Sequence, residues 1–326
     1  MILIICDYDD VHVKAVIDKL PQNSFFLLYT NLLLNRYKFY FTGISANIFD
    51  VLNGQTLDVN KVEKVWYRRT IAPRLKKKKG EEVFSDIRIR EVLTFLNYLK
   101  VLLIKKDWLS GHPLTETQAQ SKIDQLYTAI NLGFDVPKTV FSNDKKFILE
   151  TLNEKEQLAV KSIAPNLLKS NKYIENDIIF YTALISKKEF DKISASRIKK
   201  TVNFIQEYIE KDYELRITIV GLEAFSCKIT SKYLPKDKGQ VDFRQGYDYG
   251  LKYENYSISN DLYKLCINFL SSYNLNFGCF DFVVSQDGKI FFLECNSNGQ
   301  WLWIEQENPN LQISNSIVRY LTSTHH

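Results

Sequence analysis

The sequence predicts an α/β (α+β) protein that is divided into three subdomains. Short apolar runs with strand character alternate with stretches in which apolar residues recur at helical spacing. The length of 326 residues suits two or three domains, and 45% hydrophobic and 25% charged residues are ordinary for a globular protein. We place the subdomains at residues 1–114, 115–205 and 206–326.

Composition narrows the class of protein. The five cysteines are odd in number and include no Cys-x-x-Cys pair, which argues against disulfides and a zinc site. The apolar start at Met1–Cys6 lacks the basic residues of a signal peptide, and no apolar run approaches the roughly 18 residues of a membrane span. The net charge of +5 favours anionic ligands but is too small for a nucleic-acid-binding protein. We expect a cytoplasmic protein that binds neither nucleic acid nor membranes.

The first subdomain is expected to begin with a strand at Ile2–Cys6, followed by a helix whose apolar face runs from Val13 to Leu20. A longer helix is predicted at Ile87–Ile104. Between them, the four lysines Lys76–Lys79 indicate a solvated loop, because like charges repel; docking of an acidic peptide is the alternative. Further strands are predicted at Phe25–Tyr29, Tyr37–Phe41 and Val62–Tyr67.

The second subdomain is expected to open with a helix from Ala119 to Ile130, capped by Thr115 or Thr117 and stopped at Gly133. Two apolar runs follow that have the length and composition of strands. Near the carboxyl terminus one amphipathic helix is predicted, and Pro309 is expected to open a last helix that runs through Leu321. The strands are placed at Leu158–Lys161 and Asn203–Gln206, and the amphipathic helix at Asp261–Tyr273.

A β-hairpin near the end of the chain is the most informative feature. Phe280–Val284 and Lys289–Asn296 read as two strands joined by a tight turn that contains Gly288. Glu294 and Asn296 are two residues apart and so share one face of the sheet, where the hairpin can bring Asp281 beside them. Two carboxylates and an amide suit Mg²⁺, which prefers oxygen ligands. An exposed hairpin edge that carries acidic residues is the alternative.

Further residues suit the binding of a nucleotide. Lys161 ends a strand and can meet a phosphate as a point charge, although strand-end lysines commonly extend to water. The strand that ends at Gln206–Ile209 presents backbone groups that can read an adenine edge. Glu214 is placed to accept hydrogen bonds from ribose hydroxyls and Arg216 to hold a phosphate or carboxylate; a surface Glu–Arg pair is the alternative. Arg244 adds a second guanidinium for a transferred phosphoryl group.

In this order, the residues resemble the ATP-grasp ligases, and especially their RimK-like branch, which carries a strand lysine, a Q-E-Y-I hinge, an acidic-x-Arg strand, a D-F-R segment and a final D…E-x-N set. The resemblance covers residues 115–300. Over its full length the chain resembles the graspetide (microviridin-type) peptide macrocyclases of that superfamily. The segments that carry this second likeness are Val65–Arg69, Gln118–Leu126, Gly133–Thr139 and Phe180–Thr182.

The resemblance implies an ATP-grasp fold, with ATP bound between the central and carboxyl-terminal subdomains. It also implies which residues bind ATP and Mg²⁺. Lys161 and, less strongly, Lys122 would contact the phosphates. Glu207 and Tyr208, within the hinge Gln206–Ile209, would hold adenine through their backbones, and Glu214 would hold the ribose. Arg216 and Arg244 would steady the γ-phosphate and the acyl phosphate, and Asp281, Glu294 and Asn296 would bind Mg²⁺.

The implied activity is that of an ATP-dependent, ADP-forming peptide macrocyclase. It would activate Asp or Glu side chains of a ribosomal precursor peptide as acyl phosphates and join them to Thr or Ser hydroxyls, as esters, or to Lys amines, as amides. The resemblance also suggests a homodimer. A RimK-like or glutathione-synthase-like ligase that joins free amino acids to a protein or small molecule is the first alternative. A nucleotide-binding module without turnover is the second.

One departure from the family concerns the lid over the phosphates. Many ATP-grasp enzymes have a glycine-rich flap there, whereas residues 162–200 contain no glycine. Closure would then depend on residues such as Ser162, Asn166, Ser170 and Asn171. The lysine-rich segment 169–200 is expected to help dock a leader peptide. Trp301 and Trp303, just after the hairpin, are expected to pack in the core; lining of an acceptor pocket is the alternative.

Overall fold

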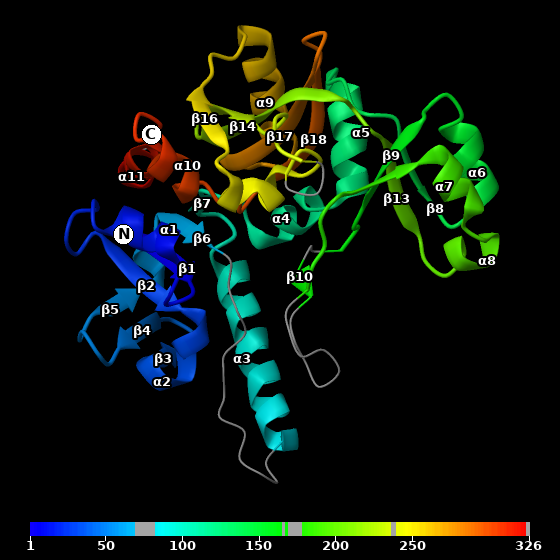
Figure 1. Ribbon diagram of the computed structural model, residues 1–326. Coiled ribbons are helices and arrows are strands. Elements are labelled where there is room, and N and C mark those ends of the chain that lie inside the picture. Colours follow the sequence, from blue (N-terminus) through cyan, green and yellow to red (C-terminus); the bar gives the residue numbers. More distant parts are fainter. Residues whose placement is uncertain (69–81, 165–166, 169–177, 236–238, 324–326) are drawn as a thin grey trace.

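The computed structural model describes residues 1–68, 82–164, 167–168, 178–235 and 239–323. Figure 1 shows the three regions that its main sheets define: an amino-terminal region with a long protruding helix, a central region, and a carboxyl-terminal sheet between them. The predicted lysine loop Lys76–Lys79, and the lid candidates Asn166, Ser170 and Asn171, lie outside the described residues. No helix in the described ranges is long and apolar enough to cross a membrane.

A parallel sheet forms the centre of the amino-terminal region. Its strand order is β2-β1-β6-β7, and the entirely buried, apolar β1 lies inside it, as expected for a strand covered on both faces. Asp10 caps the helix α1 because its carboxylate accepts from the N–H groups of His12 and Val13. The strands are β1 (Ile2–Cys6), β2 (Phe25–Tyr29), β6 (Lys64–Tyr67) and β7 (Asp107–Trp108), and α1 is Val11–Ile17.

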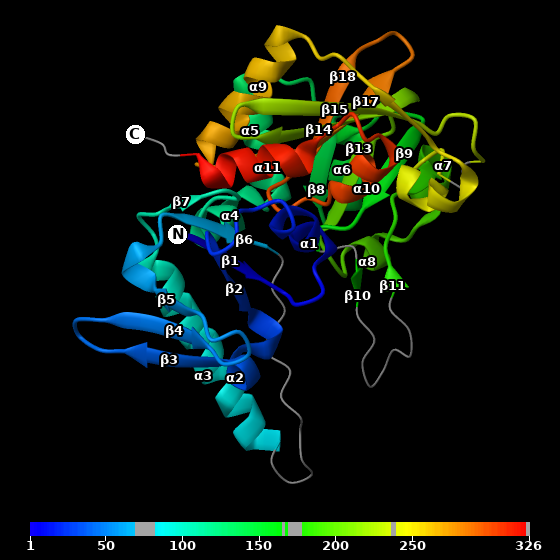
Figure 2. The ribbon, with the colours of Figure 1, turned by 90° about the vertical axis from the view of Figure 1, so that its left-hand side faces the viewer.

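A smaller antiparallel sheet and the long helix α3 complete this region (Figure 2). Only the first strand of the small sheet was predicted. The second alternates buried and half-buried positions and packs one face only, so it lacks a continuous apolar run. The elements are α2 (Leu33–Arg36), β3 (Tyr37–Phe41), β4 (Ala46–Asp50), β5 (Thr56–Asp58) and α3 (Glu82–Leu102), with 3₁₀ turns at Thr30–Leu32 and Val59–Lys61.

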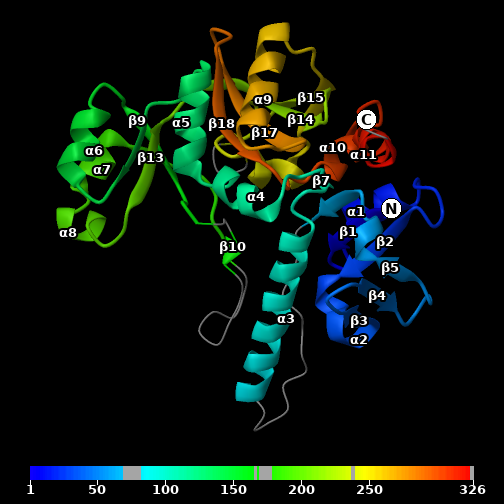
Figure 3. The ribbon, with the colours of Figure 1, turned by 180° about the vertical axis from the view of Figure 1, so that it is seen from behind.

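The central region is an antiparallel sheet of order β12-β9-β13-β8, packed against three short helices through a core that contains Ile148, Leu158, Phe190 and Ile205. Figure 3 shows the helices on the outer side of this sheet. The strands are β8 (Thr139–Ser142), β9 (Gln157–Lys161), β12 (Ala183–Ser186) and β13 (Asn203–Glu207). The helices are α6 (Lys145–Thr151), α7 (Lys187–Lys192) and α8 (Ala195–Ile198), and β10 (Leu167–Leu168) pairs with β11 (Ile178–Ile179).

The carboxyl-terminal sheet has the order β16-β15-β14-β17-β18 and is antiparallel throughout. Helices α5 and α9 contribute Ala129 and Phe269 to a core with Phe280 and Phe292 of the sheet. The strands are β14 (Lys211–Val220), β15 (Glu223–Thr230), β16 (Lys252–Asn255), β17 (Phe277–Ser285) and β18 (Ile290–Asn296). The helices are α5 (Lys122–Leu132) and α9 (Asn260–Ser272), and Phe243–Tyr249 is a 3₁₀ helix.

The prediction of one helix from Ala119 to Ile130 is wrong. The chain forms α4 (Pro113–Ala119) and then α5, and the cap of α5 is Ser121, whose Oγ accepts from the N–H of Asp124 at 3.4 Å. The predicted stop is correct: Gly133 takes a left-handed φ of 95°. The restart places Lys122 in the first turn of α5, next to the hairpin.

The last two helices, α10 (Leu302–Glu307) and α11 (Ile313–Thr322), return to the amino-terminal region, where Trp301, Ile313 and Ile317 join the core of the parallel sheet. Pro309 does not open α11, which begins at Ile313. Packing therefore crosses two predicted boundaries, because α5 lies on the carboxyl-terminal sheet and α11 beside α1. The subdomain limits at 114 and 205 remain predictions.

Candidate active site

A cavity of about 1240 Å³ opens where the central sheet, the carboxyl-terminal sheet and α4 meet. A smaller cavity of about 70 Å³ adjoins it and shares Lys161, Thr182 and Glu214 with it. All four hinge residues, Gln206–Ile209, line the smaller cavity. The larger one is lined by the residues that the sequence marked for binding phosphates, ribose and metal: Lys122, Lys161, Glu214, Arg216, Arg244, Asp281, Glu294 and Asn296.

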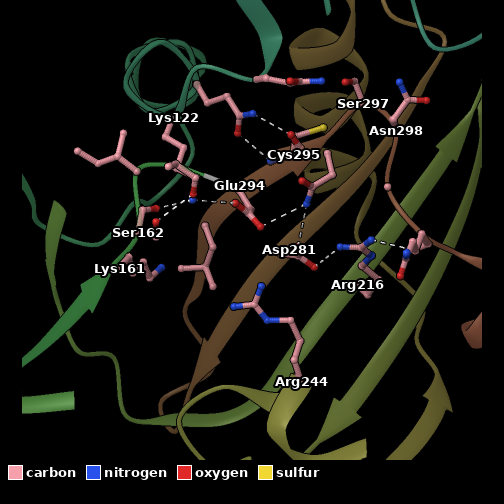
Figure 4. A pocket seen from close by; sticks show the side chains of 18 of the residues that line it. Lys122, Lys161, Ser162, Arg216, Arg244, Asp281, Glu294, Cys295, Ser297 and Asn298 are labelled. Carbon is pink, nitrogen blue, oxygen red and sulfur yellow. Dashed lines mark hydrogen bonds and ion pairs between the residues drawn. The ribbon is translucent and has the colours of Figure 1, made fainter. Parts of the chain in front are cut away.

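The predicted hairpin brings its three oxygen-bearing residues together, and Figure 4 shows two of them, Asp281 and Glu294, beside each other. Asp281 on β17 stands opposite Glu294 on β18, and the register shifts directly after this pair, where Phe282 faces Phe292. The Asn296 amide lies between the carboxylates, with Nδ2 3.3 Å from Asp281 Oδ2 and 3.3 Å from Glu294 Oε1. The bulge thus turns both acidic side chains toward the same face.

Cations beside these carboxylates set their protonation. Burial raises the pKa of Asp281, and the Arg216 guanidinium, 2.5 Å from Asp281 Oδ1, opposes that rise. Burial acts in the same direction on Glu294, but Lys122, Lys161, the Asn296 amide and Arg244 together outweigh it and leave the pKa of Glu294 below its usual value. Glu294 is therefore ionised at neutral pH and ready to hold a cation.

The donor set fits Mg²⁺. Two carboxylates and an amide supply hard oxygen ligands from two strands, and the adjoining cavity leaves room for substrate oxygens. A half-turn of the Asn296 amide brings its Oδ1 to the place of Nδ2, so that all three residues present oxygen. Among the described residues, no cluster of three or more His, Cys, Asp and Glu side chains offers a competing centre.

Strand β18 is held by a glutamine that was not among the predicted site residues. Gln125, buried on α5, donates from Nε2 to the Cys295 carbonyl at 2.8 Å and accepts from the Cys295 N–H at 2.8 Å. Cys295 lies between Glu294 and Asn296, so these two hydrogen bonds fix the positions of Glu294 and Asn296 relative to α5. The sequence signal for Gln125 was its place in Gln118–Leu126, one of the segments that carry the resemblance to the graspetide macrocyclases.

Two lysines reach the same cavity from the opposite side. Lys122 donates to the Ser162 carbonyl at 2.8 Å and lies 3.9 Å from Glu294 Oε2. Lys161 closes β9, and burial lowers its pKa to about 8 against the attraction of Glu294. The alternative of a lysine extended to water does not describe Lys161, because it lines both cavities.

We predict that the affinity of Lys161 for phosphates depends on pH. The ammonium is charged below its pKa, so kcat/KM for ATP should fall as pH rises through about 8, by about tenfold for each further unit. A Lys161→Arg variant, which stays charged above that range, should lose this fall while retaining activity. Initial rates between pH 6.5 and 10 test this. A fall of the same midpoint in Lys161→Arg would contradict it.

The two predicted arginines are each held by a carboxylate. Arg216 bonds Asp281 through Nη1 and the Gln300 carbonyl through Nη2 at 3.0 Å. Arg244 forms two bonds with Asp242, at 2.8 and 2.5 Å, and Asp242 also accepts from the Thr182 N–H at 3.0 Å. Asp242 was not among the predicted site residues. It orients Arg244 toward the cavity and connects it to the segment that enters β12.

Neighbouring backbone carbonyls occupy two of the hinge N–H groups that were predicted to contact adenine. The Glu207 N–H donates to the Lys138 carbonyl at 2.9 Å, and the Tyr208 N–H to the Gln157 carbonyl at 3.1 Å. Both donors are therefore occupied, and only the carbonyls of these two residues remain for adenine. Within the described part of the chain the Ile209 N–H meets no acceptor, and Gln206 Oε1 is buried without a partner. An adenine edge offers a matching donor and acceptor.

Glu214 lines both cavities, but its carboxylate is already in use. Lys211 bonds one oxygen and the Ser231 hydroxyl the other, at 3.0 Å. Burial raises the pKa of Glu214, and Lys211 opposes the rise. Each oxygen keeps a second lone pair, so bonds from ribose hydroxyls are still allowed.

Of the two tryptophans that follow the hairpin, Trp301 is buried against His12, whereas Trp303 packs on Phe243 and lines the larger cavity.

The amino-terminal region anchors the turn that follows β18. Arg68, almost completely buried, donates from Nη1 to the carbonyls of Asn298 (2.8 Å) and Gly299 (3.0 Å), and its Nε lies 3.3 Å from Asp10. Gly299 leaves no space for a side chain, because a Cβ would stand 2.5 Å from that of Cys279 and 3.1 Å from Arg216 Nη2. This close approach fixes the position of Arg216 relative to the parallel sheet of the amino-terminal region.

One protein family and several solved structures are similar to this chain. The model of a family described as the RimK-like ATP-grasp domain matches residues 119–321. No curated protein matches the sequence. The macrocyclase MdnC of Microcystis aeruginosa MRC, solved with the precursor peptide MdnA, is 24% identical with a TM-score of 0.81 over 98% of this chain and 99% of its own.

Two further solved structures are similar over their whole length. A RiPP-associated ATP-grasp ligase of Chryseobacterium gregarium, in complex with ADP and a leader and core peptide, is 21% identical with a TM-score of 0.83, over 98% of this chain and 96% of that one. The ATP-grasp ligase PsnB, complexed with a phosphomimetic variant of a minimal precursor, Mg and ADP, is 16% identical with a TM-score of 0.75, over 98% and 97%. The predicted ATP-grasp fold is confirmed.

Proposed function

This chain belongs to the RimK-like ATP-grasp family, and from that premise we propose that it is an ATP-dependent, ADP-forming macrocyclase of a ribosomal precursor peptide. The observation that carries the proposal is one cavity that combines an Asp–Glu–Asn face with two arginines and two lysines, next to a slot lined by the hinge. Such a cavity suits the transfer of a phosphoryl group to a carboxylate.

The nucleotide would lie across both cavities. Its adenine would occupy the slot between the hinge and Leu293, with the Ile209 N–H and Gln206 Oε1 as candidate partners. Its phosphates would extend toward Lys161 and Lys122. Asp281, Glu294 and Asn296 would hold Mg²⁺, which, when bound, neutralises charge on the transferred phosphoryl group.

The protein's own groups then act on the acceptor carboxylate. A carboxylate is a poor electrophile, and phosphorylation converts it into an acyl phosphate with a good leaving group. Arg216 and Arg244 point guanidinium donors into the cavity and would hold the carboxylate and its phosphorylated form. A hydroxyl or amine of the same peptide then attacks, forming an ester or amide and releasing phosphate. No serine or cysteine nucleophile of the enzyme takes part.

The larger cavity has room for a peptide substrate beside the nucleotide phosphates. At about 1240 Å³ it exceeds the roughly 300–1,000 Å³ of a site for one small ligand. The similar structures are described as a macrocyclase or ligases with precursor, leader or core peptides, which supports the same class of substrate.

ADP release tests the proposal. Release should require ATP, Mg²⁺ and a precursor peptide with repeated Thr and Glu or Asp residues. Turnover with free amino acids alone would instead favour the RimK-like or glutathione-synthase-like alternative. Binding of ATP without any release would favour the nucleotide-binding module.

We propose that a leader peptide docks on the segment 169–200, of which residues 178–200 are described. This part contains α7 and α8 and five exposed or half-buried lysines, which favour an acidic partner. Hydrogen exchange should show protection there when peptide is added. Protection elsewhere, with unchanged exchange in this segment, would reject the assignment.

We also propose a homodimer in which α3 contributes to the interface. Phe84, Ile87, Tyr98 and Val101 are exposed on this helix at spacings of three, eleven and three residues, which places them on one face. Light scattering should give twice the chain mass. Replacing Ile87 and Tyr98 by glutamate should give monomers, and a wild-type monomer would contradict the proposal.

A further inference from the structure

Part of the larger cavity belongs to neither ATP-grasp sheet. Its wall includes Tyr67 at the end of β6, Asn97 and Lys100 on α3, and His112 just before α4. None of these residues was predicted to act in the site. Because the wall is continuous with the side that carries Asp281 and Arg216, one extended substrate can contact both.

Lys100 is the charged group of this wall, and it is held in place. Its ammonium donates to the Tyr67 hydroxyl at 3.3 Å and to Asn97 Oδ1 at 3.4 Å, and it lies 4.6 Å from the centre of the Tyr67 ring. The Leu114 N–H donates to His112 Nδ1 at 3.2 Å, so the His112 proton is on Nε2, which lies 3.1 Å from the Lys100 carbonyl. The backbone and the side chain of Lys100 are thus both held by hydrogen bonds.

Lys100 differs from the other cations of the cavity in having only neutral partners among the described residues. Arg216, Arg244 and Lys122 each have a carboxylate within 4 Å, and Glu294 is the dominant attraction on Lys161. Within the ranges that the structure describes, no carboxylate comes within ion-pair distance of Lys100, whose partners are a hydroxyl and an amide. A half-buried ammonium in neutral company is suited to an anion from outside.

We infer that Lys100, with Tyr67 and Asn97, binds a second carboxylate of the substrate peptide, one that is not being activated. The inference rests on the proposed function. Arg216 and Arg244 each already face a carboxylate of the protein, whereas the partners of Lys100 in the described ranges are neutral, so a second carboxylate of the peptide is attracted to Lys100. Occupation of this subsite would set the register of the peptide and therefore which acidic side chain reaches Arg216 and Arg244.

The test is a double-mutant cycle on peptide binding. The probe is a fluorescently labelled, Thr/Glu-rich leader-plus-core peptide, titrated in the presence of ADP, together with a panel in which each acidic core residue is replaced singly by its amide. Lys100→Met should raise the Kd of the parent peptide about tenfold, the loss of one charged hydrogen bond. One amide peptide should show the same rise with wild-type enzyme and no further rise with Lys100→Met.

The control is Lys38→Met, which removes an exposed lysine of the same region and should leave every Kd unchanged. An unchanged Kd for Lys100→Met, or equal rises for all peptides of the panel, would overturn the subsite, as would failure of every peptide to bind. A raised KM for ATP in Lys100→Met would instead assign Lys100 to the nucleotide. Since binding is measured without turnover, coupling without ring formation rejects only the proposed function, and ring formation without coupling rejects only the subsite.

Discussion

Glu294→Gln should reduce ADP release and ring formation by at least about a thousandfold, because several kcal/mol of charge stabilisation are lost with the metal ligand. Glutamine keeps the shape of the side chain but removes its charge. The carboxylate of Glu294 is ionised, since the neighbouring cations and the Asn296 amide hold its pKa below the usual value despite burial. The change therefore removes the charge that would face Mg²⁺ while the Asn296 contact can persist.

Steady-state assays at saturating ATP, and again with Mg²⁺ raised, measure this effect. Glu254→Gln is the matched control, because Glu254 is an exposed carboxylate on β16 outside the cavity, and it should keep wild-type rates. Circular dichroism should show that both variants are folded. ATP consumption by Glu294→Gln at a near wild-type rate would remove Glu294 from the metal site.

Arg216→Met should lower kcat by about 10²–10³-fold, the usual loss when one donor to a developing charge is removed. Arg216 touches Asp281 and the Gln300 carbonyl, so its loss also frees the turn that follows β18. Asp281, whose pKa is already raised by burial, would lose the cation that opposes the rise and would protonate more readily. The defect should therefore deepen as pH falls.

Because a buried carboxylate without its partner destabilises the fold, Arg216→Lys provides a second variant. It keeps the charge near Asp281 but not the forked geometry, and it should fold normally with an intermediate kcat. Arg319→Met, which removes an exposed guanidinium paired with Glu223, is the matched control and should be fully active. Equal activity of Arg216→Met and Arg319→Met would exclude a role of Arg216 in the reaction.

The elements that the sequence predicted best are those whose signals are local. The hairpin is an example: a left-handed Gly288 turn between two apolar runs leaves few alternatives, and the residue period of two then decides that Glu294 and Asn296 share a face. The pairing of Glu294 with Asp281 depends on the bulge that follows Asp281, and no local sequence pattern predicted that bulge.

The parts that escaped prediction depend on contacts between distant segments. Gln125 acts on Cys295 across 170 residues, and Arg68 on Gly299 across 231. Each looks like an ordinary polar residue on its own element. Likewise, the occupied N–H groups of Glu207 and Tyr208 follow from neighbouring strands, so the hinge motif alone did not reveal which donors remain. Long-range partners of this kind are visible only in the folded chain.

Mass spectrometry of a Thr/Glu-rich precursor peptide, incubated with the enzyme, ATP and Mg²⁺, tests the central claim most directly. A macrocyclase joins two side chains of the same peptide, so the product should lose the mass of one water for each bond formed, and fragmentation should fail inside each ring. Glu294→Gln in the same reaction should leave the peptide unchanged. A gain in mass, equal to an added amino acid, would contradict the account and show a ligase that uses a free second substrate.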